Sequence, residues 1–532
     1  MVVRDELILV FDLTSTLLRA GLGVVDLIRG PLIELPTRVG RMAGKSGSRV
    51  EDYLVGAQLA AAEAVTAAGG ARDFDIIDPC RVDERTGFEV TDWNALEAVF
   101  RYAMHTSLAL QRPPLAHPTV LSVPSSCPPG TVDALHRLLF ERLLLPQLLV
   151  STRPFFASGA AGALSCVVLD LGYRGEGSEI SIVHESQELP GPSGLRLAHI
   201  DEGVCDDYCA LKLLEAHPDI PQQLLAAAGR TGDLAPGELA NALRRVVAEL
   251  KVRELIGLES PLVAGLATAG AAVPGIAGVE GEDGSFDVAK VIVEGKVNDI
   301  VKKKGKGKEG DAVEEEEGDY VRVANPFAPA PAASVETDLT GAPAPGTTLR
   351  LGPARHRYLE PLFLPSLLGS LAPSASPAAA LLGMHEYARS AAGASAPAAG
   401  VAEAIGVALS AVEDAEVRSA VGEAVVVISS GRIASNRALG PALIPLLSPF
   451  RSDLAAGYDA EGMPLTRPMR YIRSPDYFAN FKDRAGDWMV YLGACIMGKL
   501  LLGDTQSKLF MSKQDYATHG PAYYRQLPLI QS

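Results

Sequence analysis

The sequence predicts an α/β fold with two similar halves that face each other across a cleft. Residues 6–18 and residues 164–186 each read as an apolar strand that ends in an aspartate, a polar turn and a second strand. Short apolar runs bounded by Gly and Asp are typical of buried strands that enter a hairpin. This pattern occurs twice, about one domain apart, which indicates an internal duplication with Asp12 and Asp170 facing each other. Two unrelated hairpins are the alternative interpretation, because a strand, an aspartate and a turn form a common pattern.

Length and composition favour a folded protein of several domains. The chain has 532 residues, of which 48% are apolar and 21% charged, and its formal net charge is −16. This charge argues against binding of a nucleic-acid backbone and is compatible with a basic protein partner. Cys205 and Cys209 are close in sequence, but no second ligand pair completes a metal site, so we expect no metal. A signal peptide and an apolar run of about 18 residues are both missing, which predicts a cytoplasmic or nuclear protein without membrane contact.

The stretch between the two hairpins carries two predicted helices and two predicted strands. VTDWNALEAVFRYAM has the start signals of an amphipathic helix that Thr91 can cap. Residues 120–123 and 148–151 read as buried strands, and residues 131–145 read as a helix that Pro146 ends. After the second hairpin, the sequence predicts helices at 202–216, 238–255 and 488–502, a folded stretch at 349–369 and a buried strand at 425–429.

Two low-complexity stretches, residues 258–345 and 370–400, interrupt the second half. They are rich in Gly, Ala, Ser and Pro, and the first contains VKKKGKGKEGDAVEEEEGD at 301–319, a basic block followed by an acidic one. Such a segment buries little apolar surface, so we expect both stretches to be solvated insertions. A basic block is also typical of a nucleic-acid or nuclear-import patch, but the acidic block beside it screens that role.

Several sequence blocks, in order, resemble actins. FDLTSTLLRAGLG resembles the first phosphate loop of actins, LPTRVGR resembles FPSIVGR, and VTDWNALE resembles VTNWDDME. LGPARHRYLEPLFLPSLLG follows IGNERFRCPEALFQPSFLG without a gap, and YLGACIMGKLL with FMSKQDYATHGP resembles the actin C-terminus. The resemblance implies an actin-like α/β fold: duplicated halves of the actin, Hsp70 and hexokinase type around a central cleft, with four subdomains and two low-complexity insertions.

The resemblance also implies how the chain is divided among the four subdomains. The expected parts are 1–30 and 90–150 in subdomain 1, 31–89 in subdomain 2, 151–186 in subdomain 3, 187–400 in subdomain 4 with the start of subdomain 3 and the insertions 258–345 and 370–400, 401–485 in subdomain 3, and 486–532 as the C-terminal part of subdomain 1.

A finer set of motifs resembles one class, the ninth fungal actin-related protein of SWI/SNF-type and RSC-type chromatin remodellers. These motifs are RAGLG, DYLVG, FDVAKVIVEGKVNDIVKKK and PDYFANFKDRAGDWMVYLGACIMGKLLLGD. The likeness implies a nuclear protein that pairs with a second actin-related protein. It also implies binding to the helicase-SANT-associated helix of the remodeller ATPase, among other subunits of the complex.

In actins, two glycine-rich hairpins and a third loop hold ATP, since glycine lets backbone amides approach the phosphates. The resemblance places the nucleotide-binding positions at Asp12, Thr14, Ser15, Thr16, Asp170, Gly172, Ser430 and Gly431. Threonine replaces glycine at Thr14 and Thr16, and its branched Cβ crowds this approach.

The actin residues that position the attacking water fall at Arg153 and Glu179 by this alignment. An arginine cannot accept a proton from water, so we expect no catalytic residues, no ATP hydrolysis and no resident cofactor or metal. Bound but unhydrolysed ATP with Mg²⁺ is the alternative to a structurally used cleft. Without a metal, Asp12 and Asp170 are expected to cap the turns through backbone amides.

In actins, a groove between the first and third subdomains accepts amphipathic helices, and here it is expected to bind the ATPase helix. The resemblance lines this groove with Phe156, Gly159, Leu492, Ile496, Met497 and Leu500. The alternative function is a nucleotide-binding actin-related protein of a cytoskeletal complex such as dynactin. The threonines of the first hairpin and the short polar loop at 42–51 favour the chromatin subunit.

Overall fold

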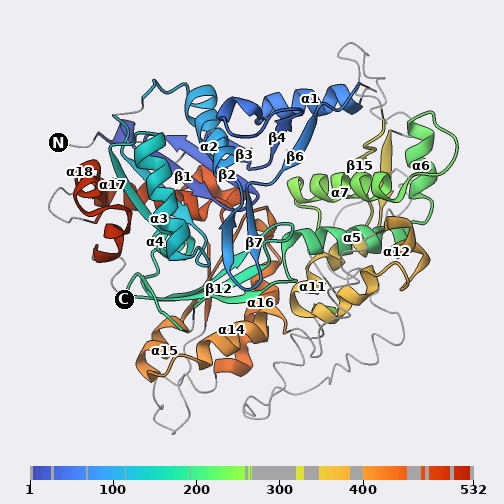
Figure 1. The fold of residues 1–532 in the computed structure, drawn as a ribbon. Coiled ribbons are helices and arrows are strands. Elements are labelled where there is room, and N and C mark those ends of the chain that lie inside the picture. The colour runs from blue at the N-terminus through green and yellow to red at the C-terminus, as the bar shows by residue number, and fades with distance from the viewer. Residues whose placement is uncertain are drawn as a thin grey trace, which may run out of the picture.

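A computed structural model gives the structure of the chain, and two β-sheets with helices around them form its centre (Figure 1). The structure describes residues 4–24, 29–67, 70–113, 116–191, 193–257, 260, 262–263, 265, 319–328, 347–383, 399–451, 469–473, 478–503 and 509–527. Within this part of the chain, no helix is long and apolar enough to cross a membrane.

The first sheet contains the first predicted hairpin. Its strand order is β19-β10-β9-β1-β2-β3, where β1 pairs antiparallel with β2, and β9 and β10 continue in parallel. Asp12 is the register partner of Arg19 across the hairpin and of Ser122 on β9. The strands are β1 (Leu9–Leu13), β2 (Leu17–Leu22), β3 (Ile33–Pro36), β9 (Thr119–Val123), β10 (Gln147–Thr152) and β19 (Met511–Ser512).

The second sheet repeats this arrangement. Its order is β13-β12-β11-β17-β18, with β14 also on β12; β11 and β12 form the second hairpin, and β17 and β18 continue in parallel. Two sheets that each combine an antiparallel hairpin with two parallel strands confirm the duplicated α/β fold. The strands are β11 (Cys166–Leu171), β12 (Ser178–His184), β13 (Gln187–Glu188), β14 (Leu195–Leu197), β17 (Ala424–Ser429) and β18 (Arg470–Ile472).

Two helices, α4 (Arg153–Ala161) and α17 (Met489–Gly503), share a buried core with residues of both sheets. The helices cross closely, since a Cβ at Gly493 would lie 1.8 Å from the carbonyl oxygen of Phe156. Only glycine is compatible with this approach. The crossing therefore fixes α17 against the helix that follows the first sheet.

Helices α2 (Trp93–Arg101) and α3 (Pro129–Arg137) cover the outer face of the first sheet. A π-helical turn follows each of them directly: η3 (Tyr102–Ser107) after α2 and η4 (Leu138–Arg142) after α3. Asp92, and not Thr91 as expected, caps α2: its Oδ1 accepts bonds from the amides of Asn94 and Ala95. The Tyr53 hydroxyl, 2.7 Å from Asp92 Oδ2, holds this carboxylate in place.

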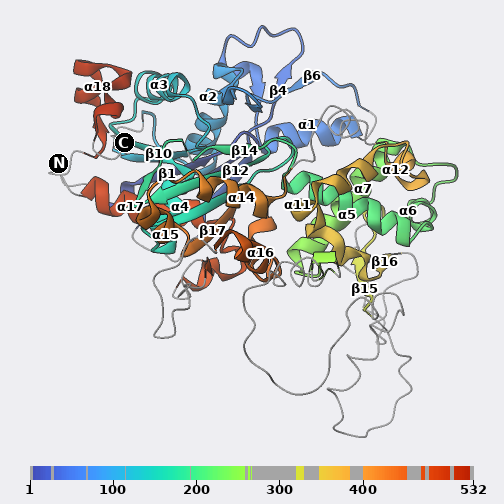
Figure 2. The ribbon, with the colours of Figure 1, turned by 90° about the horizontal axis from the view of Figure 1, so that it is seen from below.

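A helical group lies on the side of the molecule away from α18 (Lys513–His519) in both ribbon views (Figures 1 and 2). It comprises α5 (Glu202–Ala216), α6 (Ile220–Ala227), α7 (Pro236–Val252), α12 (Pro377–Leu382) and the hairpin β15 (Val321–Ala324) with β16 (Thr348–Leu351).

Two of these elements, β15 and α12, form inside the stretches predicted as insertions, and Leu382 of α12 is buried. Alanine- and proline-rich composition thus conceals short ordered elements. Residues 301–318 of the charged block lie outside the described residues. The remaining elements are α1 (Ala57–Ala67), β4 (Val39–Met42), β5 (Tyr53–Leu54), β6 (Phe74–Ile77), β7 (Cys80–Asp83), β8 (Gly87–Val90), α11 (Glu360–Phe363), α14 (Val401–Ser410), α15 (Ala415–Val421) and α16 (Leu439–Leu447).

Candidate functional site

The side chain of Arg153, the first residue of α4, lies between the aspartates of the two hairpins. Its Nη1 is 2.5 Å from Asp12 Oδ1, while its Nε and Nη2 are 2.6 and 3.3 Å from the two carboxylate oxygens of Asp170. Burial alone would raise the pKa of Asp12, but the charges of Arg153 and Arg19 lower it below its usual value. The structure thus brings the two predicted aspartates together around a cation supplied by the chain.

Arg19 of β2 extends this network to the other half. Its Nη1 donates to Asp12 Oδ2 at 3.0 Å, and its Nη2 donates to the carbonyl oxygen of Ser430 at 2.7 Å. Its Nε donates to Glu34 Oε1 at 3.1 Å. Arg19 therefore connects the first hairpin to the loop after β17.

The expectation that the two aspartates cap their own turns is wrong. Asp12 accepts bonds from Arg19, Arg153 and the Ser122 hydroxyl, the last at 2.6 Å, and Asp170 accepts bonds from Arg153. Buried arginines satisfy these carboxylates better than turn amides because guanidinium–carboxylate bonds are charge-assisted and can be bidentate.

Glu176, in the loop between β11 and β12, joins the two phosphate-type hairpins. Its Oε1 accepts bonds from the Ser15 hydroxyl at 2.8 Å and from the Thr16 amide and hydroxyl, both at 3.0 Å. Its Oε2 accepts a bond from the Tyr173 amide of the second hairpin at 2.8 Å. Sequence reasoning missed Glu176, because a single glutamate in a hairpin loop looks like a solvated one in the sequence.

A second carboxylate, that of Glu202 at the start of α5, fills the loop after β17. Its Oε2 accepts bonds from the amides of Arg432 and Ile433 at 2.6 and 3.0 Å. Its Oε1 accepts a bond from Lys251 Nζ at 2.7 Å. A Cβ at Gly431 would lie 2.0 Å from Glu202 Oε2, so this predicted nucleotide residue instead makes room for a carboxylate. Sequence reasoning also missed Glu202.

The space left between the hairpins is small. Its volume is about 20 Å³, which is room for about one water molecule. Gly172 is closed off as well, since a Cβ there would lie 2.2 Å from the carbonyl oxygen of Gly177. The lining residues are Thr14, Ser15, Val82, Pro124, Arg153, Asp170, Gly172, Glu176, Gly177, Glu179 and Ser430.

These residues do not fit ATP with Mg²⁺. One amide in each hairpin, that of Thr16 and that of Tyr173, already donates to Glu176, and the aspartates that would face a metal ion already pair with Arg153. A triphosphate here would meet a carboxylate, and two anions in a poorly solvated site repel each other. Among the described residues, no cluster of His, Cys, Asp or Glu could hold a metal ion.

Glu179 lines the small space and is the register partner of Asp170 on β12. Its Oε2 accepts a bond from the Ser126 amide at 3.3 Å, and its Oε1 lies 3.4 Å from Arg196 Nε. Burial raises the pKa of Glu179 to about 7. A carboxyl group with this pKa can exchange a proton at neutral pH, but the space beside it does not admit a nucleotide.

The residues predicted to line the partner groove divide by exposure. Phe156 and Leu492 are fully buried, whereas Leu500 is 62% exposed on the same helix as Leu492. Ile496 and Met497 are half-buried, and a Cβ at Gly159 would lie 3.3 Å from Met497 Cε. The accessible part of the predicted groove is therefore formed by Gly159, Ile496, Met497 and Leu500.

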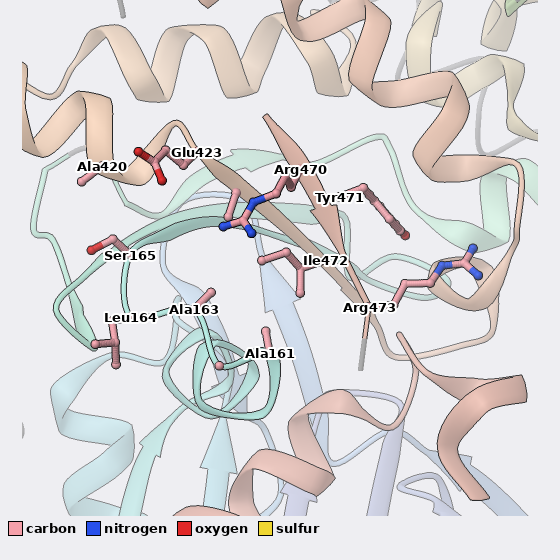
Figure 3. Close-up of a pocket in the computed structure, with 12 residues that line it drawn as sticks. Ala161, Ala163, Leu164, Ser165, Ala420, Glu423, Arg470, Tyr471, Ile472 and Arg473 are labelled. Carbon is pink, nitrogen blue, oxygen red and sulfur yellow. The ribbon is translucent and has the colours of Figure 1, made fainter. Parts of the chain in front are cut away.

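A larger cavity, of about 800 Å³, lies beside β18 and the C-terminal end of α4 (Figure 3). Arg470 is exposed on this strand, and Ile472 packs against the same core as Ile496 and Met497. Its lining residues are Ala161, Gly162, Ala163, Leu164, Ser165, Ala420, Glu423, Ala424, Arg470, Tyr471, Ile472 and Arg473.

Residues 5–193 match the family model described as Actin. The match contains both hairpins and Arg153, and it supports an actin-family protein. With the duplicated sheets described above, it identifies the fold as actin-like. A comparison with curated proteins gave no match.

Proposed function

We propose that this chain is a non-catalytic, actin-related subunit of a SWI/SNF-type or RSC-type chromatin remodelling complex. It binds the helicase-SANT-associated helix of the remodeller ATPase together with a second actin-related protein, and it acts in the nucleus. The proposal rests on the actin family match and on the resemblance of the finer motifs.

The observation that most supports a non-catalytic role is the position of Glu176. Its carboxylate accepts bonds from amides of both hairpins, which are the donors that a nucleotide would need. Hydrolysis also requires a water molecule aligned with a terminal phosphate, and neither the space nor the donors remain for that phosphate.

The surface of α17 supports the binding role. On this helix, Leu500 follows Ile496 by four residues and Met497 by three; Leu500 is exposed, and the other two are half-buried. A groove that receives an amphipathic helix needs apolar contacts at such spacing, and methionine adapts to an incoming side chain. The formal charge of −16 would accelerate the approach of a basic helix.

Purification of the tagged full-length protein from nuclear extract, with mass spectrometry of the co-purified proteins, tests this function. We expect a remodeller ATPase and a second actin-related protein at near-equal amounts. Recovery of dynactin subunits instead, with the tagged protein outside the nucleus in fluorescence images, would favour the cytoskeletal alternative.

A further inference from the structure

We propose that Glu176 and Arg153 replace the nucleotide and its metal ion as the groups that hold the cleft closed. The two halves of the protein are then joined in one arrangement without any bound ligand. This inference concerns the conformation of the cleft, so it does not depend on whether the protein belongs to the proposed remodelling complex.

Glu176 provides the anion. Its two oxygens accept four bonds, three from Ser15 and Thr16 in the first half and one from Tyr173 in the second. Backbone amides in such turns bind phosphates and carboxylates alike, because both are anions with oxygen acceptors. The carboxylate therefore makes the bridge between hairpins that a phosphate group would otherwise make.

Arg153 provides the cation. It bonds to Asp12 in the first half and to Asp170 in the second, and its side chain is 1% exposed. Two carboxylates that face each other in a buried site repel unless a positive charge lies between them. The guanidinium removes that repulsion from a position fixed by the chain.

A third link runs in parallel with these two. Arg19 of the first half donates to the carbonyl oxygen of Ser430 in the second half at 2.7 Å. Three polar bridges thus cross the cleft, and each is made entirely of protein atoms; the bridges of Arg153 and Arg19 share Asp12. Opening the cleft would expose or unpair all of them together.

Hydrogen exchange on the full-length protein tests this inference. In the wild type, the amides of Thr16 and Tyr173 should exchange slowly without ligand, and addition of ATP with Mg²⁺ should leave their exchange unchanged. Glu176→Ala should accelerate exchange of both hairpins at least tenfold. Glu185→Ala, which removes an exposed glutamate after β12, is the matched control and should change neither.

Each outcome decides the question. Slow exchange that ATP leaves unchanged and that Glu176→Ala abolishes supports the inference. Protection that appears only after addition of ATP overturns it, and so does unchanged exchange in Glu176→Ala. If Glu176→Ala does not fold, Glu176→Gln replaces it. The comparison of wild-type exchange with and without ATP also decides the question, because it needs no variant.

Discussion

Nη1 of Arg153 lies 2.5 Å from Oδ1 of Asp12, and neither side chain has appreciable contact with solvent. The pair connects the first residue of α4 to Asp12 near the end of β1, and the second carboxylate partner, Asp170, completes a largely buried triad. Such triads cost desolvation free energy when they form, but removing one member leaves an uncompensated charge. The contribution of Arg153 to stability is therefore much larger than that of a surface ion pair.

Arg153→Met should lower the free energy of unfolding by about 3–5 kcal/mol, because the Asp170 carboxylate then loses its cation and faces the Asp12 carboxylate, which keeps only Arg19. Chemical denaturation measures this change. Arg81→Met, which removes an exposed pair with Glu89, is the control and should cost less than about 1 kcal/mol.

The double variant Arg153→Met with Asp170→Asn should recover part of the stability lost in Arg153→Met, since the carboxylate left without a cation is gone while Asp12 keeps its ion pair with Arg19. A single Arg153→Met variant as stable as the wild type would show that the triad is not intact in solution.

We expect no ATP hydrolysis by the isolated chain. The amides of Thr16 and Tyr173 donate to Glu176, and the resemblance to actins places Arg153 where a residue that orients water is expected. Phosphate release from purified protein should equal the buffer blank. Steady turnover that Asp170→Ala abolishes would contradict this prediction.

Capture of the remodeller helix should depend on α17. Leu500→Asp and Met497→Asp should each weaken binding of the isolated helix by roughly 3 kcal/mol, because a charge would be buried where an apolar contact is lost. Calorimetric titration measures the loss. Val407→Asp, on the exposed face of α14, is the control. Unchanged affinity in both α17 variants, with normal melting, would place the partner on another face.

The raised pKa of Glu179 predicts a pH dependence of stability. The folded protein binds this proton more tightly than the unfolded chain, because burial raises the pKa from 4.5 to about 7. The associated stability is present below pH 4.5 and is lost as the pH rises to about 7, a change on the order of 3 kcal/mol.

Glu179→Gln should remove this loss. Between pH 4.5 and 7, the free energy of unfolding of the variant should therefore rise relative to that of the wild type. Burial lowers the pKa of His136 to about 4, so its contribution to stability increases as the pH rises. This contribution is the same in both proteins and cancels when they are compared. Parallel pH profiles would show that Glu179 is not buried as described.

The sequence predicts the hairpins and many helices well because these are local features. Residues 202–216 form α5 at the predicted bounds, where Asp201 accepts a bond from the Val204 amide and so begins the helix. The cap of α2 is Asp92 and not Thr91, although both were available in the local sequence; aspartate ranks at least as high as threonine at this position, so the error lay in the choice between neighbours.

The content of the cleft was only half predictable. The loss of the loop glycines at Thr14 and Thr16 indicated a changed site. The groups that fill it, Glu176 and Glu202, act on amides about 160 and 230 residues away in the chain, so their role depends on how the halves meet. No local pattern distinguishes such a glutamate from a solvated one.

The covalent attachment of Glu176 has a consequence for the cell. The fraction of a protein that holds a free nucleotide depends on the nucleotide concentration relative to Kd. A carboxylate attached to the chain instead has an effective concentration set by the short loop that carries it. The cleft is thus loaded as soon as the chain folds, and starvation that depletes ATP does not empty it. If Glu176 holds the cleft closed as proposed, we expect the protein to keep one shape through metabolic states that would alter a nucleotide-dependent protein.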